Sequence, residues 1–162
     1  MGIEIERKFL VKCDKWRSSV TTPGKRLRQG YLVNGPPATI RVRVADEHAW
    51  LTIKGPVEGL SRAEYEYSIP ISDAEEMLTK RCVSPIIEKI RYRLPHEGLI
   101  IELDEFLGAN AGLFIAEVEL PFEDTQFSKP DWFGIEVSEY FRYHNSQLAK
   151  RPYTTWAKMT QR

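Results

Sequence analysis

Glu4, Glu6 and Lys8 stand at alternate positions in the segment Ile3–Leu10. In a β-strand, side chains two residues apart point to the same face, so two carboxylates and one ammonium should project together there. Like charges this close need a charge of opposite sign between them. Because divalent cations favour carboxylate oxygens, a metal ion is the obvious candidate.

Charged faces of the same kind recur in six further segments, and most of them carry charges of one sign. In chain order they are Arg41 and Arg43; Lys54; Glu64 and Glu66; Lys89, Arg91 and Arg93; Glu102 and Asp104; and Glu117 and Glu119. A solvated sheet face usually mixes signs, because unlike neighbours are mildly favourable and like neighbours are unfavourable. The sorting by sign therefore favours an enclosed face over an open one, although an ordinary sheet with one wet face remains the alternative.

The cost of these like pairs indicates what the enclosed face would bind. Charges two residues apart on a strand are separated by about 6.6 Å, and such a pair costs about 2.5 kcal/mol at an effective dielectric constant of 20. Salt removes most of that cost on an open surface but not inside a barrel. Basic pairs then need a polyanion and acidic pairs need divalent cations, so a polyphosphate with Mg²⁺ or Mn²⁺ meets both needs.

The elements that must hold these side chains follow from period-two alternation with Gly/Pro punctuation. The predicted strands are 3–11, 26–33, 38–45, 48–54, 62–70, 87–94, 98–105 and 113–120. A capping box at Ser72–Glu75 predicts a helix over 72–82. A second helix is predicted over 131–149, with its aromatic residues Trp132, Phe133, Tyr140 and Phe141 in the core. A short helix near 14–20 is compatible with the pattern.

These elements predict an α+β fold. We expect one domain over residues 1–162, built as an eight-stranded antiparallel β-barrel with a charged interior and flanked by a few helices, including a C-terminal helix. A barrel of eight strands is about wide enough to hold one small extended ligand. The apolar strand faces would then point outward, where the helices could cover part of them.

Composition excludes several classes of partner. The chain has 23 basic and 23 acidic residues, so bulk charge does not favour nucleic acid or an anionic membrane as a partner. Cys13 and Cys82 are the only cysteines, carry no motif and are expected to be reduced. Because no apolar run approaches the length of a membrane span and no signal peptide is recognisable, we expect a cytoplasmic location.

The ordered set of motifs resembles the CYTH superfamily, the triphosphate tunnel metalloenzymes. It opens with Glu-x-Glu-x-Lys at Glu4–Lys8 and continues with the basic and acidic segments in the order given above. The opening motif alone is weak, whereas the ordered set is strong and covers nearly the whole chain. Gln29–Leu32 and Trp132–Val137 look most like the small bacterial tripolyphosphatase-type members. Arg93 extends the basic strand beyond the family pattern and is placed at the tunnel mouth.

The resemblance implies a role for each charged position. The substrate-binding residues would be Lys8, Arg41, Arg43, Lys54, Lys89 and Arg91, which grip phosphate oxygens. Glu4, Glu6, Glu117 and Glu119 are the first choice as ligands for one or two divalent ions, Mg²⁺ or Mn²⁺. Glu64, Glu66 and Asp104 would complete the surroundings of the metal or position water. The catalytic base is left open between a metal-bound water near Glu4 or Glu6 and a perturbed Lys89.

The implied reaction is hydrolysis of inorganic tripolyphosphate to pyrophosphate and phosphate. Phosphoryl transfer mainly requires positioning and electrostatic stabilisation, so no Ser or Cys nucleophile is needed. A class IV-type adenylyl cyclase, a thiamine or nucleoside triphosphatase, and a non-enzymatic polyphosphate-binding barrel are the alternatives. Redundant carboxylates argue against simple anion binding. A homodimer is compatible with the resemblance, although no stripe in the sequence marks a dimer surface.

A few other side chains invite a functional reading. His48, His96 and His144 are isolated and are assigned no catalytic role. Tyr31 either gates the tunnel or packs on its strand. Arg142 either closes over a phosphate or stays solvated near the end of the predicted helix.

Overall fold

The computed structural model describes residues 2–156. Its strands are β1 (Gly2–Val11), β2 (Lys25–Gly35), β3 (Ala38–Ala45), β4 (His48–Lys54), β5 (Ser61–Ser68), β6 (Ile87–His96), β7 (Leu99–Phe106), β8 (Phe114–Glu119) and β9 (Phe133–Glu136). Its α-helices are α1 (Ile71–Lys80) and α2 (Asn145–Lys150). Short 3₁₀ turns are η1 (Asp14–Ser19), η2 (Gly108–Asn110), η3 (Phe141–Tyr143) and η4 (Tyr153–Thr155).

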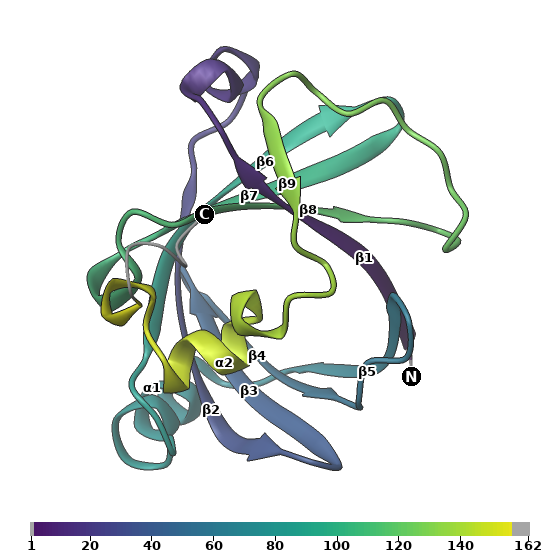
Figure 1. Cartoon of the computed structure of the whole chain (residues 1–162). Helices are drawn as coiled ribbons and strands as arrows, with labels where there is room; N and C mark the ends of the chain where they lie inside the picture. The colour runs from purple at the N-terminus through teal and green to yellow at the C-terminus, as the bar shows by residue number, and fades with distance from the viewer. Residues whose placement is uncertain (1, 157–162) are drawn as a thin grey trace.

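The first eight strands close into a barrel (Figure 1). The order around the wall is β1-β5-β4-β3-β2-β6-β7-β8, and β8 pairs with β1 to complete the circle. All these pairings are antiparallel. The predicted eight-stranded antiparallel barrel is thus confirmed.

The barrel closes at strand β1, which pairs with β8 on one edge and with β5 on the other. One of its edges pairs with β8 from Glu6 to Leu10. Its other edge pairs with β5 over Gly2–Ile5 and then with β9 at Phe9 and Val11. Between the parts of this edge that pair with β5 and β9, the segment after β9 provides hydrogen bonds for the backbone of Lys8. The Lys8 N–H donates to Ser138 Oγ at 2.9 Å, and the Lys8 carbonyl accepts from the Val137 N–H at 2.8 Å. The first charged motif of the sequence therefore lies on the closing strand.

Much of the apolar core lies outside the barrel, as period-two alternation predicts. Val42 and Val44, which alternate with the inward Arg41 and Arg43, pack with Ala74 and Leu78 of α1. A second cluster on the outside of β1 and β6–β8 is closed by η1 and by the segment leading into β9; it includes Phe9, Trp16, Leu94, Leu103, Val118, Trp132 and Phe133. Alternation therefore leaves the charged positions pointing inward.

One end of the barrel interior is apolar, which the sequence interpretation did not predict. Tyr31, Ile87, Phe106 and Ile115 share their strand faces with inward charged residues, yet they form a buried cluster. Val137, Tyr143, Leu148 and Ala149 complete that cluster from η3, α2 and the loop before them. Figure 1 shows this C-terminal segment crossing one opening of the barrel. The interior is therefore a charged chamber with an apolar plug at one end.

The helix predictions were only partly right. Helix α1 confirms the helix predicted over 72–82, but it begins at Ile71 after Pro70, and no side chain caps it, so the predicted capping box is wrong. The helix predicted over 131–149 is also wrong, because its first part forms β9 and only Asn145–Lys150 is α-helical.

Two contacts explain why β9 forms instead of a helix. Arg7 of β1 donates two hydrogen bonds to Glu136, at 2.9 and 2.6 Å. At Gly134 the chains approach so closely that a Cβ would lie 3.1 Å from the Leu10 carbonyl oxygen. Trp132 and Phe133 are buried as predicted, whereas Tyr140 and Phe141 are exposed. An unpaired edge of β1 thus captures a segment whose apolar spacing is typical of a helix.

Two further observations concern the whole described chain. Within residues 2–156, no helix combines the length and the apolar character needed to cross a membrane. Cys13 and Cys82 are both free thiols, in agreement with the prediction.

Candidate active site

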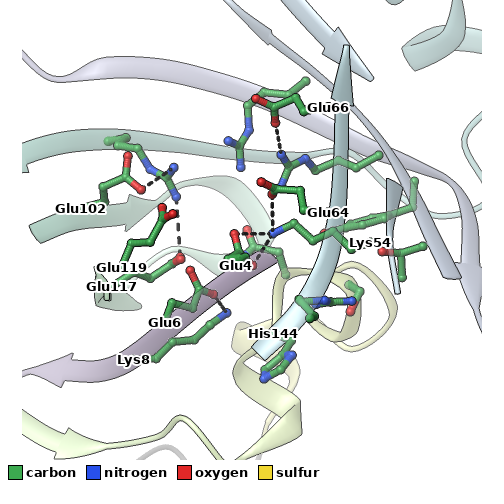
Figure 2. A pocket seen from close by; sticks show the side chains of 18 of the residues that line it. Glu4, Glu6, Lys8, Lys54, Glu64, Glu66, Glu102, Glu117, Glu119 and His144 are labelled. Carbon is green, nitrogen blue, oxygen red and sulfur yellow. Dashed lines mark hydrogen bonds and ion pairs between the residues drawn. The ribbon is translucent and has the colours of Figure 1, made fainter. Parts of the chain in front are cut away.

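A charged cavity of about 230 Å³ occupies the barrel interior (Figure 2). All eight barrel strands contribute to its lining, as do the first residues of α2. Thirteen charged residues that the sequence pattern singled out lie there together: Glu4, Glu6, Lys8, Arg41, Arg43, Lys54, Glu64, Glu66, Lys89, Arg91, Glu102, Glu117 and Glu119. Asp104 does not line the cavity but lies buried beneath two cations that do.

One wall of the cavity gathers carboxylates. Glu6 and Lys8 of β1 lie opposite Glu119 and Glu117 of β8 in the strand register. Burial, helped by the charge of Glu117, raises the pKa of Glu6 to about 8. Burial also raises the pKa of Glu119, with Glu4 adding to the effect. Despite its burial, Glu117 has a pKa well below its usual value because Lys8, Arg91 and Lys89 lie nearby. The wall therefore combines one carboxylate that cations stabilise with others that burial disfavours as anions.

Lys54 lies among the carboxylates of β1 and β5 (Figure 2). Its Nζ is 2.9 and 3.0 Å from the two oxygens of Glu4 and 3.6 Å from Glu64. Burial alone would raise the pKa of Glu4, but the ion pair with Lys54 outweighs it and the pKa lies below its usual value. Burial and the charge of Glu4 raise the pKa of Glu64.

The donor chemistry of this wall fits a divalent cation. The raised pKa values of Glu6, Glu64 and Glu119 show carboxylates that burial and like charge disfavour as anions, and a bound cation would relieve both effects. Across residues 2–156, however, no three acidic, His or Cys side chains converge closely enough to hold a metal ion. Carboxylates such as Glu4, now engaged by Lys54, would have to turn toward the ion.

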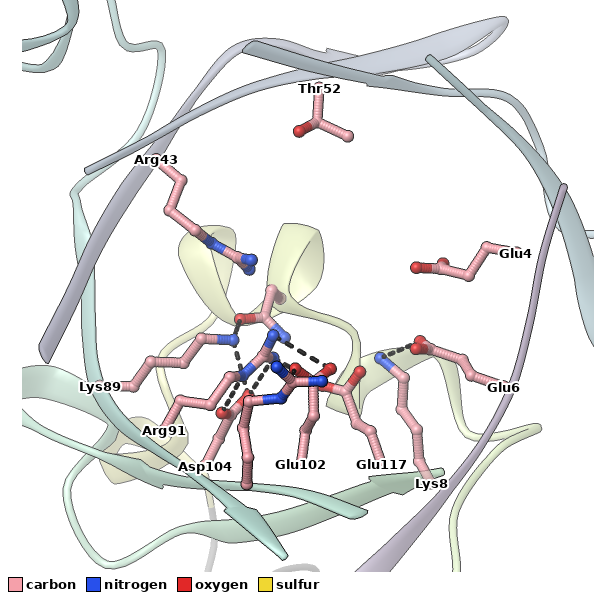
Figure 3. A network of polar contacts seen from close by, with 12 residues as sticks. Glu4, Glu6, Lys8, Arg43, Thr52, Lys89, Arg91, Glu102, Asp104 and Glu117 are labelled. Carbon is pink, nitrogen blue, oxygen red and sulfur yellow. Dashed lines mark hydrogen bonds and ion pairs between the residues drawn. The ribbon is translucent and has the colours of Figure 1, made fainter. Parts of the chain in front are cut away.

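A basic cluster on β6 is anchored by Asp104 of β7, and Arg91 of this cluster lies 3.3 Å from Glu102 and 3.6 Å from Glu117 (Figure 3). Lys89 Nζ lies 2.7 Å from Asp104 Oδ2, and Arg91 donates from Nε and Nη2 to the two carboxylate oxygens at 2.7 and 2.9 Å. Arg91 and Lys89 together hold the pKa of Asp104 below its usual value despite its burial. Both oxygens of Asp104 are thus occupied, so in this arrangement it anchors cations and has no oxygen open to a metal.

The ammonium of Lys89 lies in an unusual environment. Its side chain is fully buried, and burial lowers its pKa to about 7 against the opposing charge of Asp104. Arg91 and Arg43 contribute to the lowering because they bring like charge close to it. Lys89 therefore titrates near neutral pH, as the sequence hypothesis of a perturbed lysine requires.

Strand β3 supplies two further arginines. Arg41 Nη2 donates to Thr52 Oγ1 at 3.1 Å, and Thr52 in turn donates to Glu66 Oε2 at 2.8 Å. Arg41 Nε is buried and has no hydrogen-bond partner. Burial lowers the pKa of Arg43 to about 9, with Arg41 adding to the effect. A buried guanidinium with a donor to spare is suited to bind an anion.

Several residues of the site were missed by the sequence interpretation. Arg62 lines the cavity, and its place two residues before Glu64 was the available signal. Gln29 and Thr52 are uncharged and showed no signal of their own. Asn145 was hidden inside the wrongly predicted helix, where its register gave no indication of the barrel interior.

Other candidates take different positions. Tyr31 is buried and lines the cavity, and burial raises its pKa. His144 also lines it, and burial together with Lys8 lowers its pKa to about 4, so it is neutral at pH 7. Arg93 lies outside the cavity lining with a side chain that is 65% exposed. Arg142 lies over the rings of Tyr143 and Trp156 at 5.3 and 4.8 Å and does not line the cavity.

A closed antiparallel barrel whose eight strands enclose a cavity lined by carboxylates and cations defines the class of this protein as a charged β-tunnel. Comparison with known families agrees: the CYTH domain model matches residues 2–153, and the chain belongs to this family. Enzymes of this family, the triphosphate tunnel metalloenzymes, use divalent metals.

The chain is similar to two curated proteins over almost its whole length. It is 50% identical to the "Inorganic triphosphatase" of Acetivibrio thermocellus over 153 residues, covering 94% of this chain and 97% of that protein. It is 41% identical to the "Inorganic triphosphatase" of Nitrosomonas europaea over 152 residues, covering 90% and 96%.

Solved structures show the same fold. A crystal structure of the inorganic triphosphatase NE1496 is 38% identical, covers 92% of this chain and 95% of that chain, and superposes with a TM-score of 0.61. A putative adenylate cyclase from Bacillus halodurans reaches a TM-score of 0.62 at 16% identity, covering 87% and 100%. The second likeness concerns the fold alone.

Proposed function

We propose that this chain hydrolyses inorganic tripolyphosphate to pyrophosphate and phosphate inside the barrel, with the help of a divalent metal. The observation that carries the proposal is that one cavity gathers carboxylates, mainly on β1, β5 and β8 (the acidic wall), and cations, mainly on β3 and β6 (the basic wall), with Lys8 and Lys54 lying among the carboxylates. A polyphosphate satisfies the basic wall and a divalent cation satisfies the acidic wall. The names of the two curated relatives support the same substrate.

The phosphate oxygens are bound by the cations that line the cavity. These are Lys8, Arg41, Arg43, Lys54, Lys89 and Arg91, with Arg62 added by the structure. The unpartnered Nε of Arg41 is one donor available to the substrate. If a metal took the place of Lys54 at Glu4, Lys54 would become available to the substrate, and metal and substrate binding would then support each other. Asp104 holds Lys89 and Arg91 in place rather than ligating metal.

The metal ligands are the carboxylates of the acidic wall. Glu4, Glu6, Glu117 and Glu119 hold one or two ions, Mg²⁺ or Mn²⁺, and Glu64 lies next to them. A bound divalent ion would neutralise phosphate charge and activate the attacking water. Glu66 instead orients Arg41 through Thr52.

Lys89 can accept the proton of the attacking water, because its pKa is about 7 and an efficient general base titrates near the working pH. The raised pKa of Glu6 belongs to the metal-free protein, and as a metal ligand Glu6 would be ionised. Water attacks the terminal phosphorus, the bridging oxygen leaves with pyrophosphate, and neighbouring cations stabilise the developing charge. No covalent intermediate is needed.

A substrate comparison tests this function. Purified protein is incubated with tripolyphosphate, ATP or thiamine triphosphate, each with Mg²⁺ or Mn²⁺, and phosphate, pyrophosphate and cyclic AMP are measured. We expect the fastest phosphate release from tripolyphosphate. Cyclic AMP as the main product would establish the cyclase instead, and tight metal-independent binding without turnover would establish a binding barrel. The cytoplasmic location, the single domain over 1–162 and the homodimer stay predictions.

A further inference from the structure

Two amide side chains connect the buried cations of the tunnel. Gln29 of β2 is fully buried, and Asn145 is the first residue of α2. Asn145 Oδ1 accepts hydrogen bonds from Lys89 Nζ at 2.8 Å and from Gln29 Nε2 at 3.0 Å. Gln29 Oε1 in turn accepts from Arg43 Nε at 2.8 Å. A continuous chain of hydrogen bonds, which we call the relay, therefore runs from Asp104 through Lys89, Asn145 and Gln29 to Arg43.

The direction of every bond in this chain is determined by chemistry. Lysine and arginine only donate, so each must face an amide oxygen. With the oxygen of Gln29 given to Arg43, only its NH₂ group is left to face the oxygen of Asn145. The two amides thus have a single satisfactory orientation between two fixed cations.

We propose that Gln29 and Asn145 are positioning residues that fix the directions in which Lys89 and Arg43 present their remaining donors to the substrate. Asp104 and Asn145 take two N–H groups of Lys89, so its third position, an N–H in the ammonium or the lone pair in the neutral amine, is left for the cavity that Lys89 lines. Arg43 gives its Nε to Gln29 and keeps its Nη donors for the same cavity. This inference rests on the proposed hydrolysis and adds the residues that orient two of its cations.

The same contacts give α2 a role in the site. Helix α2 crosses one end of the barrel, and its body packs through Leu148 and Ala149 into the apolar plug. Through Asn145, α2 contacts a cation of the tunnel directly. Asn34 also ties β2 to α2, because its Nδ2 donates to the Ser146 carbonyl at 2.8 Å, but its hydrogen bond reaches no cation. Asn34 is therefore a matched control for the simple docking of the helix.

Steady-state kinetics with tripolyphosphate and Mg²⁺ test the relay. Asn145→Leu and Gln29→Met remove the amide groups at similar volume, and we expect kcat to fall by about ten- to hundredfold with a smaller change in KM, because a donor on a buried cation is left unpaired. Asn145→Asp keeps the acceptor but adds a negative charge to the cavity, so we expect its kcat to lie between those of Asn145→Leu and wild type. Asn34→Leu should lower Tm without lowering kcat. The double variant Gln29→Met/Asn145→Leu should be no slower than the slower single variant, because the two act as one unit.

The outcomes separate failure of the relay from failure of the proposed function. A wild-type protein that does not hydrolyse tripolyphosphate contradicts the proposed function itself. An active wild type with Asn145→Leu at wild-type kcat contradicts the relay. Equal losses of kcat in Asn34→Leu and Asn145→Leu would mean that docking of α2 alone matters. If Gln29→Met does not fold, the comparison of Asn145→Leu with Asn34→Leu decides, since Asn145 lies at the start of a helix and is only partly buried.

Discussion

Glu6 is a carboxyl group of the tunnel whose pKa is raised strongly. Its pKa of about 8, raised by burial and by Glu117, means that the metal-free protein keeps a proton there at pH 7. The unfolded chain, with an ordinary carboxyl, has released that proton well below pH 7. The metal-free fold therefore loses the contribution of Glu6 to its stability as the pH rises from about 4.5 to 8.

Metal binding should release this proton. At pH 7 we expect up to one proton per bound ion from Glu6, declining above pH 8 because Glu6 is then already ionised. Calorimetric titration of metal in buffers of different ionisation enthalpy measures the number. A value that is unchanged in Glu6→Gln would show that the proton comes from another group.

The carboxylates of the acidic wall should be needed for turnover. Glu4→Gln and Glu119→Gln keep side-chain size but remove charge, so we expect metal-dependent phosphate release to fall at least about a hundredfold. Glu88→Gln is the control, because Glu88 pairs with Arg26 on the exposed side of the barrel wall. Wild-type rates in both tunnel variants would remove these residues from the metal site.

For individual residues, the sequence predicted which charged side chains share the cavity but not which of them form ion pairs. The alternation at Glu4, Arg41, Lys89 and Glu117 placed all four in one cavity correctly. It could not show that Asp104 is saturated by Lys89 and Arg91, because that pairing depends on the register of two strands. The metal roles of these residues stay predictions.

Among the elements, α1 shows how an outer helix supports the tunnel wall. Its residue Leu78 and the following Cys82 pack against β2 at Gly30, where an added Cβ would lie 2.4 Å from Cys82 Sγ and 3.3 Å from Leu78 Cδ2. The close approach of helix and strand thus depends on the missing side chain. Glycine at this position fits the outside of the wall, not the tunnel.

Gly30→Ala should therefore lower the free energy of unfolding by about 1–3 kcal/mol, because the Cβ forces α1 away from β2. Gly35→Ala is the control, because open space surrounds that position. Cys82→Ala in the Gly30→Ala background should recover part of the loss by removing the clashing sulfur. Denaturant unfolding of the four proteins measures this, and equal stability of the two glycine variants would contradict the packing argument.

The strand predictions succeeded where a period of two is enforced by a charged inner face and an apolar outer face. No strand was predicted within 131–149, because Phe133, Val137 and Phe141 suit the spacing of a helix, and a helix was predicted there instead. There the outcome depends on an unpaired edge of β1 that the local sequence does not reveal. The C-terminal segment became a strand followed by a plug, and its apolar residues fill one end of the barrel.

For the molecule as a whole, like charges lie close together in the tunnel, and ligands of opposite charge should reduce the repulsion between them. A polyphosphate and divalent cations bind the folded barrel and not the unfolded chain, so they should raise Tm in a concentration-dependent way. Thermal melts with tripolyphosphate and Mg²⁺, with each alone and with chelator test this. We expect the largest rise in Tm with both together, since tripolyphosphate would neutralise the tunnel cations and the metal would neutralise the carboxylates. An equal rise in Tm from tripolyphosphate with chelator would contradict the coupling through Lys54.

Metal-dependent hydrolysis of tripolyphosphate in this tunnel can be followed by phosphorus NMR of tripolyphosphate incubated with the wild-type protein and Mg²⁺ or Mn²⁺. We expect phosphate and pyrophosphate to appear in equal amounts, and their formation to stop when a chelator removes the metal. Unchanged tripolyphosphate in the presence of metal, or the same rate with chelator, would show that the tunnel does not carry out this reaction.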